Sequence, residues 1–352
     1  MVRNKRHITV LTNCFQNTYV TTIYNRLSDI FEVKYTLDWR ALNDSNLEIV
    51  HIMWPEELIT RNEDIDDFCL FLESVKLLVY TAHNKLPHDC SNQQINYRKL
   101  YLQVIEKSHL IIHMGVFSFK SQISSFGFKE KSIIIPHPIL DIQEPLDVVD
   151  SCFGDYGRLN KRNIILVTGT TRKKREFVLS VLLHLISFKK DNYLFFSRVP
   201  KNWFLYSREF KGKYRLRNLV KFVFDKILNV GYSQSGLLDE GMLISQIIKS
   251  KVVLIPRISG YNSGIPFLVV RYGKPMIAFR TGNWAEFLKL SNVSYVIDFG
   301  NWFALRKKLN ILMKKLNNTG PELDEILHRY NPDDIARQTA FHILKKYENV
   351  YE

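Results

Sequence analysis

Short apolar runs alternate with longer amphipathic stretches along the whole chain. Such nearly continuous runs of Val, Ile, Leu and aromatic residues are typical of strands covered on both faces, so we predict parallel β-sheets. The runs are His7–Leu11, Ile49–Met53, Leu77–Thr81, Leu110–His113 and Ile133–Pro136, then Ile164–Val167, Tyr193–Ser197, Val252–Ile255, Pro275–Phe279 and Tyr295–Ile297.

Helical patterns separate these strands, and the alternation predicts βαβ units. The clearest are Thr18–Ser28, Asp64–Leu72, Asn92–Glu106, Lys174–Ser187, Leu216–Lys226, Leu238–Ser250, Ile265–Tyr272, Trp302–Leu316 and Asp333–Tyr347. We therefore predict an α/β protein of two Rossmann-like domains facing each other across a cleft. The expected domains are residues 1–150 and 163–332, joined by a polar linker over 151–162.

Composition excludes several classes of protein. The 352 residues are 46% apolar and 24% charged, the balance of a globular chain, and the four cysteines form no CxxC pair. A disulfide scaffold and a thiolate zinc site are thus not expected. No run of 18 apolar residues occurs and the N-terminus lacks the apolar core of a signal peptide, so we expect a cytoplasmic protein.

Charge differs between the two halves of the chain. Residues 1–150 carry 15 Lys/Arg and 19 Asp/Glu, a net charge of −4, whereas residues 151–352 carry 34 and 16, a net charge of +18. The second half therefore favours an anionic partner.

Polar and aromatic residues follow the predicted strands of the first domain. His83 and Asn84 stand at the exit of one strand, and Trp54 follows another. An imidazole there can donate a hydrogen bond to a substrate oxygen or move a proton, and an indole can stack on a sugar. The alternative is that His83 satisfies local backbone groups and Trp54 belongs to the core. His137, between two prolines, is expected to be a turn residue or a substrate contact.

Two loops of the second domain carry the chemistry of anion binding. Gly169 follows a strand and leads into a basic helix start with Arg172, Lys174 and Arg175. Cations there oppose the helix dipole unless an anion binds between them. Further on, Asn262 or Ser263 is expected to cap a helix starting at Gly264, leaving amides that can face a diphosphate.

At these residues the chain resembles the GT-B glycosyltransferases of family 4, in particular the members with an Asn-Ser-Gly donor motif. The matching pieces stand in family order: Trp54-Pro55-Glu56, Thr81-Ala82-His83-Asn84, Ile135-Pro136-His137-Pro138, Gly169-x-x-Arg172-x-x-Arg175, Asn262-Ser263-Gly264 and Tyr272-Gly273-Lys274-Pro275. The resemblance implies that the second domain binds a nucleotide sugar and the first binds the acceptor. It also implies that the last helix, within 333–352, crosses back to the first domain.

The resemblance assigns roles residue by residue. Arg172 with Lys174 or Arg175 would neutralise the donor diphosphate, and Ser263 and Gly264 would bind it through their backbone. Two further residues are implied: Glu286 near the end of the donor site and His83 beside the transferred sugar. No metal and no cofactor are implied, only UDP- or GDP-sugar as co-substrate.

One departure from the family leaves the donor sugar and the stereochemical outcome open. Leu268 stands where many members carry the second of two glutamates. An inverting enzyme would need a carboxylate base in the first domain, and the candidates are Glu56, Glu57 and Asp89.

The expected function is transfer of a hexose to a lipid-linked glycan in polysaccharide or lipopolysaccharide assembly, at the inner face of the cell membrane. Residues 198–226 place nine cations among seven aromatic rings, which fits an anionic lipid surface, single-stranded nucleic acid, or a plain helix–strand connection. The alternative functions are a non-catalytic, sugar-phosphate-binding GT-B relative and a nucleic-acid-binding protein.

Overall fold

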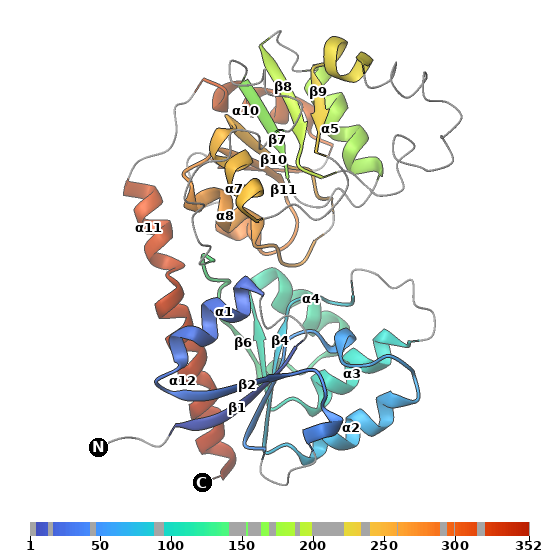
Figure 1. The fold of residues 1–352 in the computed structure, drawn as a ribbon, viewed down its shortest axis with the longest axis vertical. Coiled ribbons are helices and arrows are strands. Elements are labelled where there is room, and N and C mark those ends of the chain that lie inside the picture. The colour runs from blue at the N-terminus through green and yellow to red at the C-terminus, as the bar shows by residue number, and fades with distance from the viewer. Residues whose placement is uncertain are drawn as a thin grey trace. The chain divides into compact units, whose positions relative to one another are not determined.

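The computed structural model describes residues 5–12, 17–42, 47–87, 95–140, 153, 163–168, 174–186, 191–198, 222–233, 240–258, 260–288, 294–298, 300–314 and 321–351. The chain forms two compact units (Figure 1), the first of Met1–Asp141 with His328–Glu352 and the second of Ile142–Leu327. Apart from Phe153, the expected linker over 151–162 lies outside the described residues.

The first unit is built on a six-stranded parallel sheet in the order β2-β1-β3-β4-β5-β6. Its strands are β1 (Arg6–Leu11), β2 (Phe31–Thr36), β3 (Ile49–Ile52), β4 (Leu77–Ala82), β5 (Leu110–His113) and β6 (Ser132–Ile134). Its helices are α1 (Thr18–Tyr24), α2 (Asp64–Ser74), α3 (Tyr97–Lys107), α4 (Val116–Phe126) and α12 (Pro332–Tyr351), with short 3-10 turns η1 (Asn25–Leu27), η2 (Arg40–Leu42), η3 (Pro55–Glu57) and η4 (Lys129–Lys131).

Strand β2 is absent from the sequence prediction because it lies at the sheet edge. Its apolar residues Phe31, Val33 and Tyr35 alternate with Glu32 and Lys34, and only Phe31 is fully buried. The central strands β3, β4 and β5 are instead buried at every position. A search for continuous apolar runs finds central strands and passes over an amphipathic edge.

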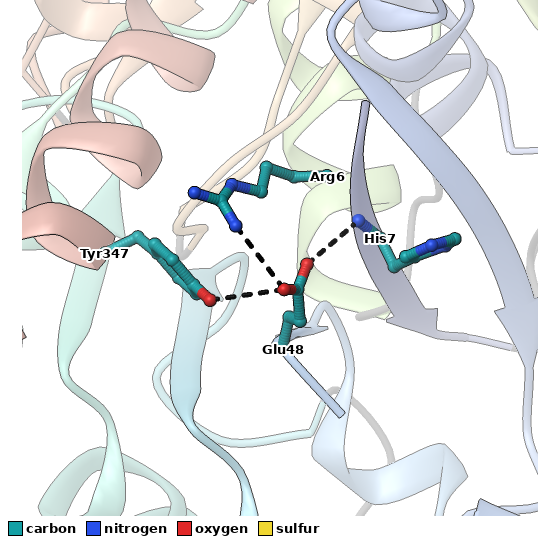
Figure 2. Close-up of polar contacts among 4 residues, drawn as sticks. All are labelled: Arg6, His7, Glu48 and Tyr347. Carbon is teal, nitrogen blue, oxygen red and sulfur yellow. Dashed lines mark hydrogen bonds and ion pairs between the residues drawn. The ribbon is translucent and has the colours of Figure 1, made fainter. Parts of the chain in front are cut away.

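The C-terminal helix α12 packs against α1 and β4 of the first unit (Figure 1). Near its start, Asp333 accepts a 2.6 Å hydrogen bond from Nε of Arg26. Near its end, Tyr347 donates to Glu48 over 3.3 Å, and the Arg6 guanidinium lies 4.8 Å from the Tyr347 ring centroid. Glu48 also pairs with Arg6 and accepts from the His7 amide, and both of these residues belong to β1 (Figure 2). Because Glu48 directly precedes β3, its carboxylate joins α12 to β1 and to the start of β3.

The second unit is built on another parallel sheet of six strands, in the order β12-β11-β10-β7-β8-β9. The strands are β7 (Asn163–Val167), β8 (Asn192–Phe196), β9 (Val230–Tyr232), β10 (Val252–Ile255), β11 (Met276–Phe279) and β12 (Ser294–Ile297). The helices are α5 (Lys174–Ile186), the π-helical η7 (Val223–Ile227), α7 (Glu240–Lys249), α8 (Ile265–Arg271), α9 (Trp284–Leu288), α10 (Trp302–Leu312) and α11 (Pro321–Arg329).

Strand order fixes where each sheet can bind a ligand. All strands run parallel, but the side on which the chain adds its next strand reverses between β1 and β3 in the first sheet, and between β7 and β10 in the second. Ligands of open parallel sheets bind at the carboxyl ends of the strands that flank such a reversal. The loops after β1 and β3, and those after β7 and β10, are therefore the places to look for chemistry.

Candidate functional site

The loop after β10 is closed around the buried indole of Trp284, from the start of α9. A Cβ at Gly260 would lie 2.1 Å from Cη2 of Trp284, and one at Gly282 would lie 2.6 Å from Cζ3. Gly282 also has φ +66°, a conformation that side chains disfavour. The Trp284 Nε1–H donates to the Phe279 carbonyl over 3.3 Å. Two glycines thus let the loops after β10 and β11 enclose one ring.

The same two loops are joined by two hydrogen bonds that Asn283 donates. The Asn283 side-chain amide donates to Oδ1 of Asn262, and the Asn283 backbone amide donates to the Tyr261 carbonyl over 3.0 Å. Tyr261 is buried, and burial raises the pKa of its hydroxyl. Asn262 therefore holds the loop in place through its side chain, instead of capping a helix.

Helix α8 begins at Ile265 with Gly264 as its N-cap and no side chain capping it, so neither Asn262 nor Ser263 is the cap. Within the part of the chain that the structure describes, no acceptor pairs with the amide N–H of Ser263 or Gly264, and both residues are half-buried. Such amides can donate to an anion.

Glu176 joins the start of α5, the helix that follows β7, to the loop that follows β10. Its buried carboxylate accepts a 3.3 Å hydrogen bond from the amide of Ile258, 82 residues further along the chain. A carboxylate at a helix start is also favoured by the helix dipole. The sequence analysis did not single out Glu176, since it shows as one acidic residue in a basic segment.

Several predicted donor residues cannot be placed as side chains. Gly169 and Arg172 lie outside the described residues, and Lys174 and Arg175 begin α5 with side chains outside the description. Glu286 lies in the first turn of α9, next but one to Trp284, and is half-buried.

In the first unit, four rings gather beyond the carboxyl ends of the strands. Trp54 stacks on His83 with 4.3 Å between ring centroids and 25° between planes. The Tyr19 ring meets the His83 ring edge-on, with 4.7 Å between centroids. It also lies 5.2 Å from the centroid of the His137 ring, with 55° between the planes. The sequence analysis selected Trp54, His83 and His137 separately, and the fold brings them together around Tyr19, from the first turn of α1. Asn84, next to His83, is also buried.

A buried polar chain lies beside these rings. The Tyr24 hydroxyl pairs with Nδ1 of His51, and Nε2 of His51 lies 2.7 Å from the Thr81 hydroxyl. Thr81 also hydrogen-bonds with the hydroxyl of Tyr19, which contacts His83. Residues from α1, β3 and β4 thereby hold one another in fixed orientations.

Burial keeps these imidazoles neutral at physiological pH. It lowers the pKa of His51 to about 3 and that of His137 to about 4. The pKa of His83 is lowered well below its usual range, first by burial and then by repulsion from His137 and His51. A neutral His83 favours a hydrogen-bonding role over proton transfer near pH 7. His137 lies 2.7 Å from the Pro138 carbonyl through Nδ1, which fits the turn as well as a substrate contact.

Of the candidate carboxylates, Glu56 and Glu57 lie in η3, which directly follows Trp54. Glu56, in η3, accepts a 2.6 Å hydrogen bond from the Tyr101 hydroxyl, and burial raises the pKa of its carboxyl group. Asp89 lies outside the described residues. In the part of the chain that the structure covers, no group of three or more His, Cys, Asp or Glu could hold a metal ion. Nor is any helix there long and apolar enough to cross a bilayer.

Comparison with known proteins identifies the fold. No protein-family model matches the chain, and no curated protein matches it. Among solved structures, a sucrose-phosphate synthase from Thermosynechococcus elongatus aligns over 98% of this chain and 100% of its own, with a TM-score of 0.67 and 11% identity. Anabaena HepE in complex with UDP aligns over 97% and 100%, with a TM-score of 0.61 and 12% identity.

A Listeria monocytogenes protein assigned as a UDP-N-acetylglucosamine 2-epimerase aligns over 98% of this chain and 97% of its own, with a TM-score of 0.59 and 10% identity. These similarities show that the chain has the GT-B fold, with two Rossmann-like domains and a C-terminal helix that returns to the first. At such identities they show the fold alone, because one fold hosts several activities.

Proposed function

We propose that this chain is a glycosyltransferase that moves a hexose from a UDP- or GDP-sugar to a lipid-linked glycan, in polysaccharide or lipopolysaccharide assembly at the inner face of the membrane. The observation that carries the proposal is the course of the loop after β10, as far as its residues are described. The loop presents the amides of Ser263 and Gly264 after the carboxyl end of β10, one of the two strands at which the strand order switches sides. Trp284 and Glu176 hold the loop in place. The UDP bound to HepE, a protein of this fold, agrees with it.

In the donor site, the leaving diphosphate would be held by these two amides and by Arg172, Lys174 and Arg175. Transfer breaks the bond between the anomeric carbon and a diphosphate oxygen, so negative charge develops on that oxygen. Amides held in place by the fold would stabilise this charge with little reorganisation, and the positive charges of the arginines would add to the effect. Asn262 and Glu286 would then shape the sugar end of the site. The proposed chemistry uses neither a metal nor a further cofactor.

In the acceptor domain, His83 would hydrogen-bond the transferred sugar, with Trp54, Asn84 and His137 around the acceptor. Its fixed orientation between Trp54 and Tyr19 supports a positioning role. A route with inversion needs a base that takes the acceptor hydroxyl proton. Glu56, whose pKa is raised, and Asp89 are the candidates for it.

The decisive experiment measures binding and then turnover. A thermal-shift panel of UDP, GDP and CDP should show one nucleotide raising the melting temperature by mass action. Arg172→Ala and Arg175→Ala should each weaken the binding of that nucleotide. Arg98 is an exposed arginine on α3, and Arg98→Ala should leave the binding unchanged.

Turnover identifies the reaction class. Incubation of the sugar nucleotide with a lipid-linked glycan extract should release nucleoside diphosphate and extend the glycan. Recovery of an epimerised nucleotide sugar would instead make the protein an isomerase, and binding without any turnover would make it a non-catalytic relative. Salt-sensitive binding of single-stranded nucleic acid, with no nucleotide binding, would refute the donor site.

A further inference from the structure

A surface groove lies where α11 ends and α12 begins, and none of its residues belongs to the loops described above. The cavity has a volume of about 470 Å³ and is lined by His328, Arg329, Asp334, Arg337, Gln338 and Phe341. The chain passes from the second unit to the first at His328. The groove is therefore a feature of the crossover itself.

The groove has a fixed framework. The Tyr330 carbonyl, in the turn between the helices, accepts a 3.0 Å hydrogen bond from the amide of Ile139. The Asn331 side chain accepts from the Asp333 amide over 2.8 Å, and Asp333 pairs with Arg26 of η1. Because the turn is bonded on both sides, its lining side chains project from a rigid corner, which lowers the entropy cost of binding.

Its charge is unbalanced. Arg329 and Arg337 are exposed, and in the described part of the chain neither guanidinium has a hydrogen-bond or ion-pair partner. They face a single carboxylate in the lining, that of Asp334. Arginine forks match the geometry of phosphate oxygens, so two of them at one groove favour a phosphate monoester.

The rest of the lining suits a polyhydroxylated ring. Phe341 is 59% exposed on the outer face of α12, with the Lys345 ammonium 5.9 Å from its ring centroid. An aromatic face covers the apolar C–H face of a sugar, while Asp334 accepts from and Gln338 exchanges hydrogen bonds with hydroxyl groups.

We propose that this groove binds a phosphorylated monosaccharide, with its phosphate at Arg329 and Arg337 and its ring against Phe341. The site differs from the donor and acceptor sites, and it does not depend on the proposed transferase activity. A ligand there contacts the segment through which the chain returns to its first unit.

The test is calorimetric titration of the full chain with glucose 6-phosphate, glucose and inorganic phosphate, with excess UDP to occupy the proposed donor site. We expect saturable one-to-one binding of glucose 6-phosphate, weakened about tenfold or more by the double variant Arg329→Gln/Arg337→Gln. The double variant Arg98→Gln/Lys120→Gln also removes two positive charges, from exposed sites on α3 and α4, and should leave binding unchanged.

Phe341→Ala tests the contribution of the sugar ring separately from that of the phosphate. It should weaken the binding of glucose 6-phosphate while leaving the affinity for phosphate unaltered. Phe341 is exposed, so the substitution removes no core packing. Equal affinity of phosphate and glucose 6-phosphate, unchanged binding in the double arginine variant, or absence of binding would each overturn the proposal. Arginine-dependent sedimentation with phosphatidylglycerol vesicles, without binding of glucose 6-phosphate, would replace it with a lipid-headgroup site.

Discussion

The indole of Trp284 occupies the space in which a side chain at Gly260 would have to lie. A Cβ at this glycine would come within 2.1 Å of Cη2, far closer than two carbon atoms can approach without displacement. The loop after β10 therefore keeps its course only while position 260 has no side chain. Since that loop continues to Ser263 and Gly264, the packing of one ring controls the proposed contact with the donor diphosphate.

Gly260→Ala should weaken nucleotide binding about tenfold by displacing the loop, with a cost in stability of about 1–3 kcal/mol from overpacking. The measurements are nucleotide titration and urea unfolding. Trp284→Phe in the same chain relieves the clash, so the double variant should lose less stability than the two single variants together, with a coupling of about 0.5–3 kcal/mol. Strict additivity would show that the two positions do not interact.

Glu176→Ala should destabilise the second unit by about 1–3 kcal/mol, because it leaves the Ile258 amide without its carboxylate acceptor. It should also weaken nucleotide binding, because Ile258 lies in the loop that leads to Gly264. Glu176→Gln keeps an acceptor oxygen and should cost less in both measurements. An alanine variant with reduced stability and unaltered nucleotide affinity would limit Glu176 to a structural role.

His83→Ala should reduce sugar transfer about a hundredfold, the scale of losing one fixed hydrogen bond to the transition state, while nucleotide affinity stays the same. The physical reason is location, since His83 belongs to the acceptor domain in the proposal and contacts Tyr19 and Trp54. Initial rates at saturating donor and a nucleotide titration separate the two effects. Equal loss of transfer and of nucleotide binding would indicate that the imidazole only supports the fold.

Acid should destabilise the first unit. His51 and His137 stay neutral in the folded state down to pH values of about 3 and about 4, whereas in the unfolded chain they take up protons below about 6.5. The unfolded state thus binds more protons in this window, and the free energy of unfolding rises with pH from about 4 to 6.5, with about 3 kcal/mol from His137 alone.

Urea unfolding at a series of pH values measures this slope. His137→Gln cannot be protonated and should flatten the pH dependence, even though its stability at pH 7 also changes. His328→Gln, an exposed histidine at the end of α11, provides the matched control and should keep the slope of the unchanged protein. A slope that His137→Gln does not alter would assign the acid sensitivity to other groups.

Much of the fold can be predicted from local patterns. The α/β class and the two Rossmann-like domains follow from alternating strands and helices, and the structure confirms them. Local apolar runs identify the central strands because burial on both faces excludes polar residues from them. The edge strands β2 and β9 escape this rule, the first through alternation and the second through its short length and Gly231.

The chain alone therefore determined which residues follow the strand ends, among them Trp54, His83 and Ser263-Gly264. It could do so because turn chemistry and apolar runs act over a few neighbouring residues. Only the tertiary structure decided which of them meet. The contact between Glu176 and Ile258 spans 82 residues, and Tyr19 meets His83 because the order of β1, β3 and β4 brings their ends together. Such contacts depend on strand order and on the packing of distant side chains, and no local pattern of residues encodes either one.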